Sequence, residues 1–555
     1  MGVFPGLTAT PLQATAYLGG VALFSIAFLV FLNSSISFVV TDLIGQKTGV
    51  GDAVGTLGFA DELFALVACP LWGLLSDRVG IRAVAVTGYC VVAVSLICLV
   101  QSTNVYPQLL LGRLAFSLGA AACSTMVTAA LPAMVARPAA KEEDEVLTEQ
   151  TEADDGNAER ASRSDSSEVT ITPNMVNASQ DSEQDAEEAS PKPVLDTTAG
   201  ISQLAGLVGL FTGLGALIAL LLFLPLPAHL RDSGSGSGQS VQVSFYIVAA
   251  VAACVAIFVF FGLSGLPGEE GKRVSAIWSA PYDEMTKTGG DGHLHTILTP
   301  KPSYVKLVKE SLKLGVTDPD IFLGYLGGFV ARASSVGISL FIPLFVNSYF
   351  LRNGLCTSDP GNPTDIRESC KRAYVLASIL TGIAETAALI CAPLFGLLGG
   401  KWQRWPLFGA SVVGLGGYIA FGFLQNPNPS RSGGHWAFIA AILIGISQIG
   451  SVVCSLGLLS RGIHRSLPSQ ESSEGENTPL LPHAERELDR PRLRGSIAGM
   501  YSMAGGGGIL LLTKLGGALF DSWMPGAPFF LLAIFNAVLI IAIVIVQLVR
   551  GMATK

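Results

Sequence analysis

Six charged side chains lie well inside long apolar stretches of this 555-residue chain. A charge at the centre of a lipid bilayer costs ~2.5–3.5 kcal/mol on insertion scales, so it persists where it meets water, a solute or an opposite charge. Buried carboxylates can bind and release protons, and arginines can pair with them or with an anion. We therefore expect a polar cavity in an apolar protein, formed by Asp61 and Glu62 in the segment GFADELFALVACP together with Arg113, Arg332, Glu385 and Lys514.

The composition places these charges in a membrane protein. Half of the residues are hydrophobic, 14% are charged, and the mean hydropathy is +0.53. Apolar runs of about 20 residues match a bilayer core of ~30 Å. The pattern predicts an all-α polytopic membrane protein whose 12 transmembrane helices lie near residues 17–40, 53–75, 83–101, 107–136, 199–226, 242–265, 319–350, 373–399, 405–424, 435–461, 495–520 and 526–549.

A polar segment at residues 266–318 separates the first six spans from the last six, and we interpret it as a cytoplasmic linker. We expect one six-helix bundle from residues 1–136 and 199–265, and a second from residues 319–463 and 494–555. Two bundles of equal size, built from repeated sequence, are typical of secondary transporters.

Two polar inserts interrupt the bundles after spans 4 and 10, at residues 137–198 and 464–493. They are rich in Ser, Glu, Asp and Pro, so they cannot bury enough apolar surface to fold, and we expect them to be disordered. Residues 141–196 carry 17 acidic and 4 basic side chains, so the remaining chain has a net charge of +5, although the whole has −8. The acidic balance therefore describes an insert and indicates nothing about a substrate.

The orientation follows from the basic residues in short loops. Arg78 and Arg82, Lys401 and Arg404, and the basic linker at residues 266–318 all fall on one side of the predicted membrane. Because Lys and Arg accumulate in cytoplasmic loops, this side is predicted to be cytoplasmic and to hold both termini.

Two loop features bear on the compartment. Cys356 and Cys370 share a loop on the non-cytoplasmic side, where a disulfide can persist, although two unpaired thiols are the alternative. Glu476 precedes Leu480 and Leu481 by four and five residues in the second insert, a spacing used by adaptor-binding sorting signals for lysosomes and vacuoles. Because the pattern is short, chance occurrence is the competing explanation. A vacuolar or lysosome-like membrane is favoured, with the plasma membrane as the alternative.

The two halves repeat each other around the carboxylates. The segment ELFALVACPLWGLLSDR in span 2 aligns with ETAALICAPLFGLLGGK in span 8 at a constant offset of 323 residues. This alignment pairs Glu62 with Glu385 and leaves Asp61 opposite Ala384. The repeat therefore selects Glu62 as the cavity carboxylate and assigns no role to Asp61.

A family resemblance becomes specific at two signatures. The segment GLLSDRVGIR, which begins at Gly73, resembles the signature between helices 2 and 3 of the major facilitator superfamily. The segment RLAFSLGAA, which begins at Arg113, resembles that superfamily's helix-4 signature. Fungal vacuolar members are the nearest general likeness. Ile81 replaces a basic residue that is usual in the first signature, and the motifs of drug antiporters and sugar porters are missing.

The resemblance implies a conformational latch at the loop after span 2. Its members are Gly73, Asp77, Arg78, Gly80 and Arg82. Asp77 is expected to contact the N-terminus of span 11, where the helix dipole favours an anion and Ser496 is a plausible N-cap. Arg78 and Arg82 could equally serve only to set the topology.

The resemblance also places spans 3, 6, 9 and 12 against lipid, and none of the six charges falls on these spans. Glu62 and Glu385 are then protonatable groups near Arg113 and Arg332, or members of a structural salt-bridge network that never titrates. Asn33 is expected either to bind substrate or to pack between helices. Lys514 lies near the outer end of its span, where its amine could extend to the membrane surface.

These features together favour a secondary active transporter that moves a small solute by alternating access and couples this movement to protons. A non-transporting receptor or scaffold of the same fold and a lipid flippase are the alternatives. The sequence has no phosphate-binding loop and no metal-spaced Cys or His cluster, so we expect neither enzyme activity nor a cofactor. The expected partners are the solute, the proton, the lipid bilayer and a sorting adaptor, and nucleic acid is not expected.

Overall fold

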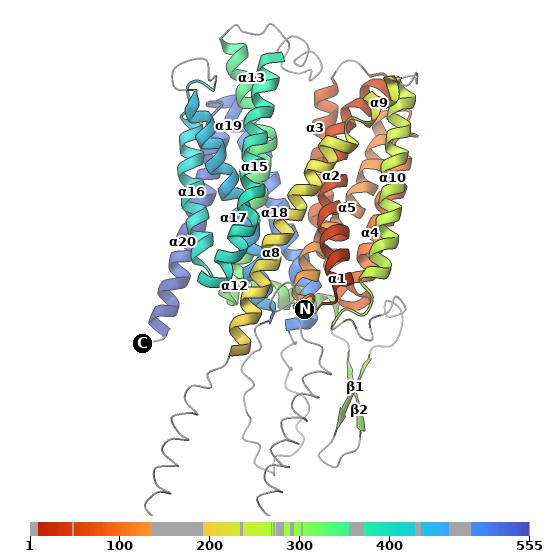
Figure 1. Ribbon diagram of the computed structural model, residues 1–555, viewed down its shortest axis with the longest axis vertical. Helices are drawn as coiled ribbons and strands as arrows, with labels where there is room; N and C mark the ends of the chain where they lie inside the picture. The colour runs from red at the N-terminus through yellow and green to blue at the C-terminus, as the bar shows by residue number, and fades with distance from the viewer. Residues whose placement is uncertain are drawn as a thin grey trace, which may run out of the picture.

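The computed structural model describes residues 9–46, 49–135, 192–232, 237–267, 269, 272, 282–288, 294–300, 303–353, 371–427, 434–464 and 490–553. Within these residues, 12 helical segments are long and apolar enough to cross a membrane. The prediction of an all-α membrane protein with 12 spans is therefore confirmed, and the two groups of six stand side by side (Figure 1).

The first bundle contains spans 1 to 6. Several spans combine α-helix with a short π-helical turn (η), in which the backbone hydrogen bonds are shifted by one residue. In chain order the elements are α1 (Pro11–Thr15), η1 (Ala16–Ala22), α2 (Leu23–Phe38), η2 (Val39–Leu43), α3 (Val50–Val79), α4 (Ile81–Leu99), η3 (Val105–Leu109), α5 (Leu110–Ala133), α8 (Lys192–Ile218), η4 (Ala219–Phe223), α9 (Leu226–Asp232) and α10 (Ser237–Gly262).

The second bundle contains spans 7 to 12 and is preceded by a short amphipathic helix, α11 (Tyr304–Thr317). Its elements are α12 (Pro319–Val336), η6 (Gly337–Phe341), α13 (Ile342–Arg352), α15 (Lys371–Trp402), α16 (Trp405–Gly422), α17 (His435–His464), the 3₁₀ turn η7 (Arg490–Leu493), α18 (Arg494–Leu511), η8 (Leu512–Gly516), α19 (Gly517–Ser522) and α20 (Ala527–Ala553).

The linker between the bundles has structure that the sequence did not indicate. It contains α11 and an antiparallel hairpin of β1 (Tyr282–Thr288) and β2 (Leu294–Pro300), in which Tyr282 pairs with Pro300. The hairpin lies beyond the end of the bundles that carries both termini (Figure 1).

The bundles meet through glycine backbones at the end that carries the termini. A Cβ atom on Gly206 of α8 would lie 2.8 Å from Gly396 Cα of α15, closer than side chains tolerate. Gly73 of α3 packs against Gly495 and Gly499 of α18 in the same way. Because glycine has no side chain, the helix backbones themselves approach, and the two bundles close over each other at this end.

Toward the other end, the faces of α3 and α15 that carry these glycines separate from the opposite bundle. Gly55 of α3 lies 18 residues before Gly73, which is five helical turns, so both residues lie on one face. Gly382 of α15 is similarly related to Gly396. A Cβ on Gly55 or Gly382 would meet nothing within 4 Å. The bundles are therefore in contact at the end with the termini, and their ribbons diverge toward the opposite end (Figure 1), where Gly55 and Gly382 border open space.

We predict that filling the glycine contact opens the closed end. A Cβ built on Gly400 of α15 lies 3.4 Å from the Ala199 Cβ of α8, close to disulfide geometry, so the pair Ala199→Cys with Gly400→Cys should cross-link. Gly396→Val should reduce the cross-linking yield several-fold, because its side chain would displace α8.

Gly382→Val is the matched control, since it adds the same side chain to the same face of α15 where space is open. Its cross-linking yield should equal that of the parent pair. Equal yields for both valine variants would show that the glycine contact does not hold this end closed.

Candidate functional site

Arg113 of α5 is the centre of a polar network between three helices of the first bundle. Its Nε and Nη2 atoms lie 3.1 and 3.0 Å from Oδ2 of Asp61 in α3. Nη2 also donates to Oδ1 of Asn33 in α2 at 2.5 Å. Arg113 is only 4% exposed, so this ion pair is shielded from bulk water. The contacts tie α2, α3 and α5 together at membrane depth.

Asp61 thus has a role that the repeat did not reveal. It neutralises Arg113, and its backbone carbonyl accepts a hydrogen bond from Ser117 Oγ at 3.1 Å. Asp61 Oδ1 and Arg113 Nη1 remain buried without a hydrogen-bond partner. Buried polar atoms normally find a partner, so this network has capacity for one more polar ligand.

Glu62 points away from this pair and toward the second bundle. It lies 11 residues before Gly73, three helical turns away on the face of α3 that meets α18. Its side chain is half-buried and makes neither a hydrogen bond nor an ion pair with the described residues. The charges of Arg332 in α12 and of Arg113 both act on it. Glu62 is therefore an acid near two arginines without being locked to either.

Glu385 repeats this position in the second bundle. It lies 11 residues before Gly396, on the face of α15 that meets α8. Its side chain is exposed in the space between the bundles and has no ion pair within the described part of the chain. The expectation that Glu385 lies near Arg113 and Arg332 is not met. The two carboxylates belong to different bundles, and the charges of Arg113 and Arg332 act on Glu62 and not on Glu385.

Lys514 reaches across the open space instead of extending to the membrane surface. Its Nζ lies 3.9 Å from the centre of the Phe59 ring in α3, although Lys514 belongs to η8 of the other bundle. A lysine over an aromatic ring is a cation–π contact, which can replace hydration at a partly dry site. Lys514 was predicted to lie in the cavity, with extension to the membrane surface as the alternative, and the contact with Phe59 differs from that alternative.

The latch brings the two bundles together through Asp77. Its carboxylate accepts hydrogen bonds from the backbone amides of Gly495 and Ser496, both at 2.7 Å, and from the Ser496 hydroxyl. Ser496 is not the N-cap that the sequence suggested, because α18 begins at Arg494 and Leu493 is its cap. Asp77 itself supplies the capping oxygens from the other bundle, where the helix dipole favours an anion.

The rest of the predicted latch supports the loop after α3. Gly80 has φ of 101°, a left-handed conformation that glycine adopts without strain. The following amide, Ile81 N, donates to Glu269 at 2.7 Å. Arg78 stacks at 3.7 Å on the ring of Tyr304, and Arg82 lies 4.7 Å from the ring of Phe260. Both arginines therefore make contacts within the protein in addition to any role in topology.

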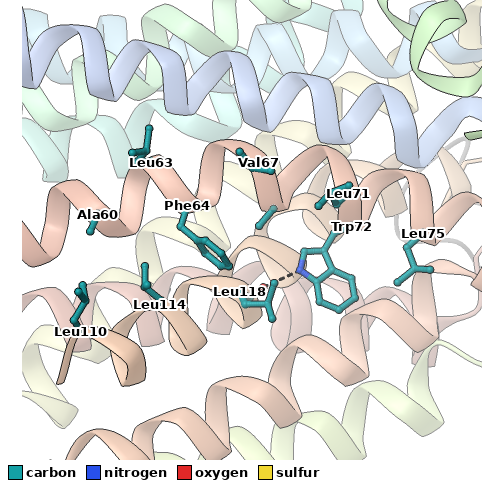
Figure 2. Close-up of a pocket in the computed structure, with 11 residues that line it drawn as sticks. Ala60, Leu63, Phe64, Val67, Leu71, Trp72, Leu75, Leu110, Leu114 and Leu118 are labelled. Atoms are coloured by element: carbon teal, nitrogen blue, oxygen red, sulfur yellow. Dashed lines mark hydrogen bonds between the residues drawn. The ribbon is translucent and has the colours of Figure 1, made fainter. Parts of the chain in front are cut away.

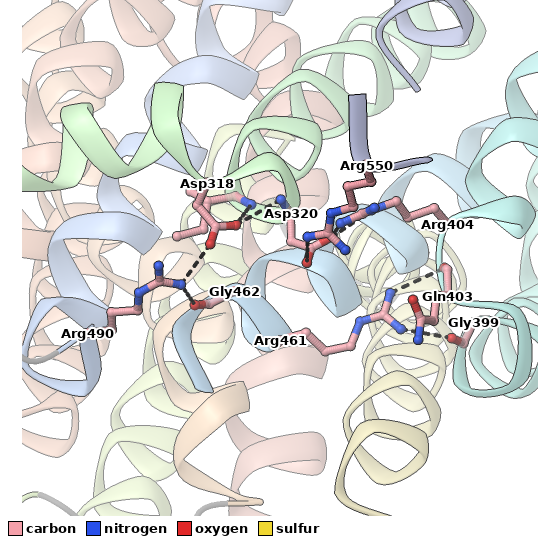
Figure 3. Close-up of polar contacts among 10 residues, drawn as sticks. Asp318, Asp320, Gly399, Gln403, Arg404, Arg461, Gly462, Arg490 and Arg550 are labelled. Carbon is pink, nitrogen blue, oxygen red and sulfur yellow. Dashed lines mark hydrogen bonds and ion pairs between the residues drawn. The ribbon is translucent and has the colours of Figure 1, made fainter. Parts of the chain in front are cut away.

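A charged cluster at the latch end of the second bundle was missed (Figure 3). Asp318 caps α12 by accepting from Asp320 N and Ile321 N, and it pairs with Arg490 at 2.7 Å. Asp320 pairs with Arg404 and with Arg550. The Asp-Pro-Asp sequence at the start of α12 was the available signal, since Asp before Pro often begins a helix. The cluster joins the latch-side ends of α12, α16 and α20.

A second surface, a groove between α3 and α5, is not part of the charged site (Figure 2). Its lining is apolar apart from Trp72, whose indole N–H donates to the Leu118 carbonyl at 2.9 Å. It lies on the face of α3 opposite Glu62, where Val67 and Leu71 are both 59% exposed. Lipid chains are the natural cover for such a face.

Some predicted features lie outside the described residues. They are the proposed disulfide of Cys356 and Cys370, the sorting signal of Glu476, Leu480 and Leu481, and residues 137–191 and 465–489 of the two inserts. The structure neither supports nor opposes these predictions. The predicted bounds of the inserts, 137–198 and 464–493, were too wide, because α8 begins at Lys192 and η7 at Arg490.

The chain forms two bundles of six spans each, which Asp77 joins at one end through its hydrogen bonds to α18. The model of the Major Facilitator Superfamily matches residues 23–140. No curated protein matches the chain.

Solved structures of low sequence identity share this fold. The human organic anion transporter MFSD10 (TETRAN) has a TM-score of 0.54 at 13% identity, covering 96% of this chain and 100% of its own. The E. coli fucose:proton symporter FucP gives 0.52 at 13%, covering 95% and 97%. The proton:xylose symporter XylE, bound to 6-bromo-6-deoxy-D-glucose, gives 0.53 at 12%, covering 96% and 94%. The chain shares the fold of these three structures, and residues 23–140 match the model of the Major Facilitator Superfamily.

We predict that the Asp61–Arg113 pair stabilises the first bundle. Arg113→Ala leaves a largely buried carboxylate without its partner, which costs ~3–5 kcal/mol for a buried pair. Removing both charges in Asp61→Ala with Arg113→Ala should recover part of the loss. Thermal unfolding of the four proteins in detergent forms a double-mutant cycle. Additive effects of the single substitutions would contradict a direct pairing.

The latch generates a graded prediction. Asp77→Ala removes three hydrogen bonds to α18, and Ser496→Ala removes one while leaving both backbone amides in place. A hydrogen bond to a charged group contributes ~1.5–3 kcal/mol. Cross-linking of Ala199→Cys with Gly400→Cys should therefore fall strongly in Asp77→Ala and weakly in Ser496→Ala. An unchanged yield in Asp77→Ala would exclude a latch role.

Proposed function

We propose that this protein is a secondary active transporter that moves a small solute by alternating access and couples transport to protons. The observation that carries the proposal is the placement of Glu62 and Glu385. Each lies three helical turns from the interbundle glycine contact on its own helix, on the face directed at the other bundle. A solute between the bundles would thus lie between two acids.

Alternating access requires contacts that can exchange between the two ends. The closed end rests on glycine packing and on the Asp77 latch, and these contacts break without burying a charge in lipid. At the open end, the Lys514–Phe59 contact already spans the two bundles. Closure of the open end would bring the two bundles closer together around this existing contact.

Proton coupling is supported by the contrast between Asp61 and Glu62. Asp61 is held by Arg113, so its charge is balanced, whereas Glu62 has no ion pair among the residues that the structure describes. Protonation of Glu62 would remove a negative charge near Arg332, so that Arg332 attracts an anionic group on a solute more strongly, and deprotonation of Glu62 would weaken that attraction. Two of the structures that share the fold are titled proton symporters and a third is titled an organic anion transporter, which is consistent with this scheme.

The membrane and orientation are also proposals. With both termini in the cytoplasm, as the distribution of basic residues favours, the observed state is open away from the cytoplasm. The acidic dileucine at Glu476, Leu480 and Leu481 favours delivery by an adaptor to a vacuolar or lysosome-like membrane. In that membrane the open end would face the lumen.

We predict that Glu62→Gln abolishes solute movement driven by a pH gradient and preserves solute exchange, because a glutamine cannot lose a proton. The protein would be reconstituted in liposomes loaded with a pH-sensitive dye. A panel of organic anions and hexoses would first identify a solute that moves protons, and the isotope-labelled solute would then measure exchange.

Glu385→Gln tests the symmetric carboxylate in the same assay, and Asp42→Asn is the control, since Asp42 is exposed at the end of span 1. Gradient-driven uptake by Glu62→Gln equal to that of the control would refute coupling through Glu62. Failure of every solute to move in the parent protein would instead favour a receptor or scaffold.

A further inference from the structure

Helix α11 exposes apolar side chains outside the transmembrane spans. Val305 is 77% exposed, Leu312 is 52% exposed and Val316 is 75% exposed. Across the described residues, the other large hydrophobic side chains with such exposure lie in the spans or directly beside their ends, where lipid covers them. Exposure of this kind in a folded protein marks a surface that is covered in the functional state.

The three side chains form a single stripe. Val305, Leu312 and Val316 are spaced by seven and four residues, which places them within ~40° of each other around the helix. The buried face of α11, formed by Leu307, Ser311 and Gly315, packs on the protein elsewhere around the helix. The stripe is therefore a second apolar face and is not required to hold α11 in place.

Lysines border the stripe on one side. Lys309 is exposed and Lys306 is half-exposed, and neither makes an ion pair with the described residues. Lys313, which is 52% exposed, pairs with Glu310 at 3.6 Å. An apolar stripe flanked by lysines is the pattern of helices that lie in the surface layer of anionic membranes.

The position of α11 matches a membrane surface. Only Asp318 separates it from α12, which enters the membrane at Pro319. The helix also contacts α3 and α18 at the latch. The Arg78 guanidinium stacks on the ring of its Tyr304. Lipid that touches α11 would thus touch the element on which the latch loop rests.

We infer that α11 is an interfacial anchor. Its Val305–Leu312–Val316 stripe inserts between lipid headgroups on the latch side of the membrane, and Lys306 and Lys309 bind anionic headgroups. The ligand is the phosphate-bearing surface of the bilayer itself. This inference does not depend on transport activity.

Photo-crosslinking tests the stripe in the full-length protein. A benzophenone amino acid replaces Val316 in one variant and Thr317 in another, and each protein is reconstituted in liposomes of phosphatidylcholine with phosphatidylglycerol. Val316 and Thr317 are adjacent and ~100° apart on the helix, so one label faces the stripe and the other does not. Mass spectrometry should find lipid adducts at least several-fold more often at position 316 than at position 317.

The contribution of the lysines is tested by changing the lipid composition. Adduct yield at position 316 should rise several-fold when phosphatidylglycerol is added to phosphatidylcholine, and Lys309→Gln should reduce that rise. Arg352→Gln, which removes one exposed charge at the opposite end of span 7, should leave the rise unchanged. Equal lipid adducts at positions 316 and 317, adducts to protein segments in place of lipid, or a rise that Lys309→Gln leaves intact would each overturn the proposal.

Discussion

The close approach of helix backbones between the two bundles is the constraint on which this structure depends. Gly206 against Gly396, and Gly73 against Gly495, leave no room for a side chain. Two helices that pack through glycines gain many short contacts, yet they bury no polar group that would resist separation. Such an interface packs closely and contains few polar contacts that would have to be broken, which is what the proposed alternating mechanism requires.

The Asp77 carboxylate adds hydrogen bonds of defined geometry to this apolar contact. Because it accepts from amides at the start of α18, it completes the hydrogen bonding of a helix end that would otherwise need water. The same carboxylate would be hydrated if the bundles parted. In the proposed mechanism, exchange between protein amides and water would keep the free energies of the two states close, whereas an ion pair in lipid would favour one state strongly.

The charges at membrane depth divide into fixed and free groups. Asp61 and Arg113 compensate each other within one bundle, so the pair would persist if the bundles moved relative to each other, as the proposed mechanism requires. Glu62, Glu385 and Arg332 have no ion-pair partner in the described residues and face the space that opens. The fixed pair maintains the bundle, and the free groups are available to a solute or proton.

The sequence by itself determined the class, the number of spans and the repeat. Twelve runs of apolar residues are forced into helices because backbone amides in lipid must bond within their own segment, so composition alone decides this level. The repeat of Glu62 and Glu385 placed both acids on equivalent helix faces, because a fixed offset within a helix sets the direction of a side chain.

Only the tertiary structure decided which charges meet. Pairing of Asp61 with Arg113, of Asp77 with the first turn of α18, and of Lys514 with Phe59 joins helices that are far apart in sequence. Helical periodicity gives the direction in which a side chain projects from its helix. It does not give the residue that packs opposite that side chain. That partner is set by the arrangement of the bundles, for which a single sequence carries no signal.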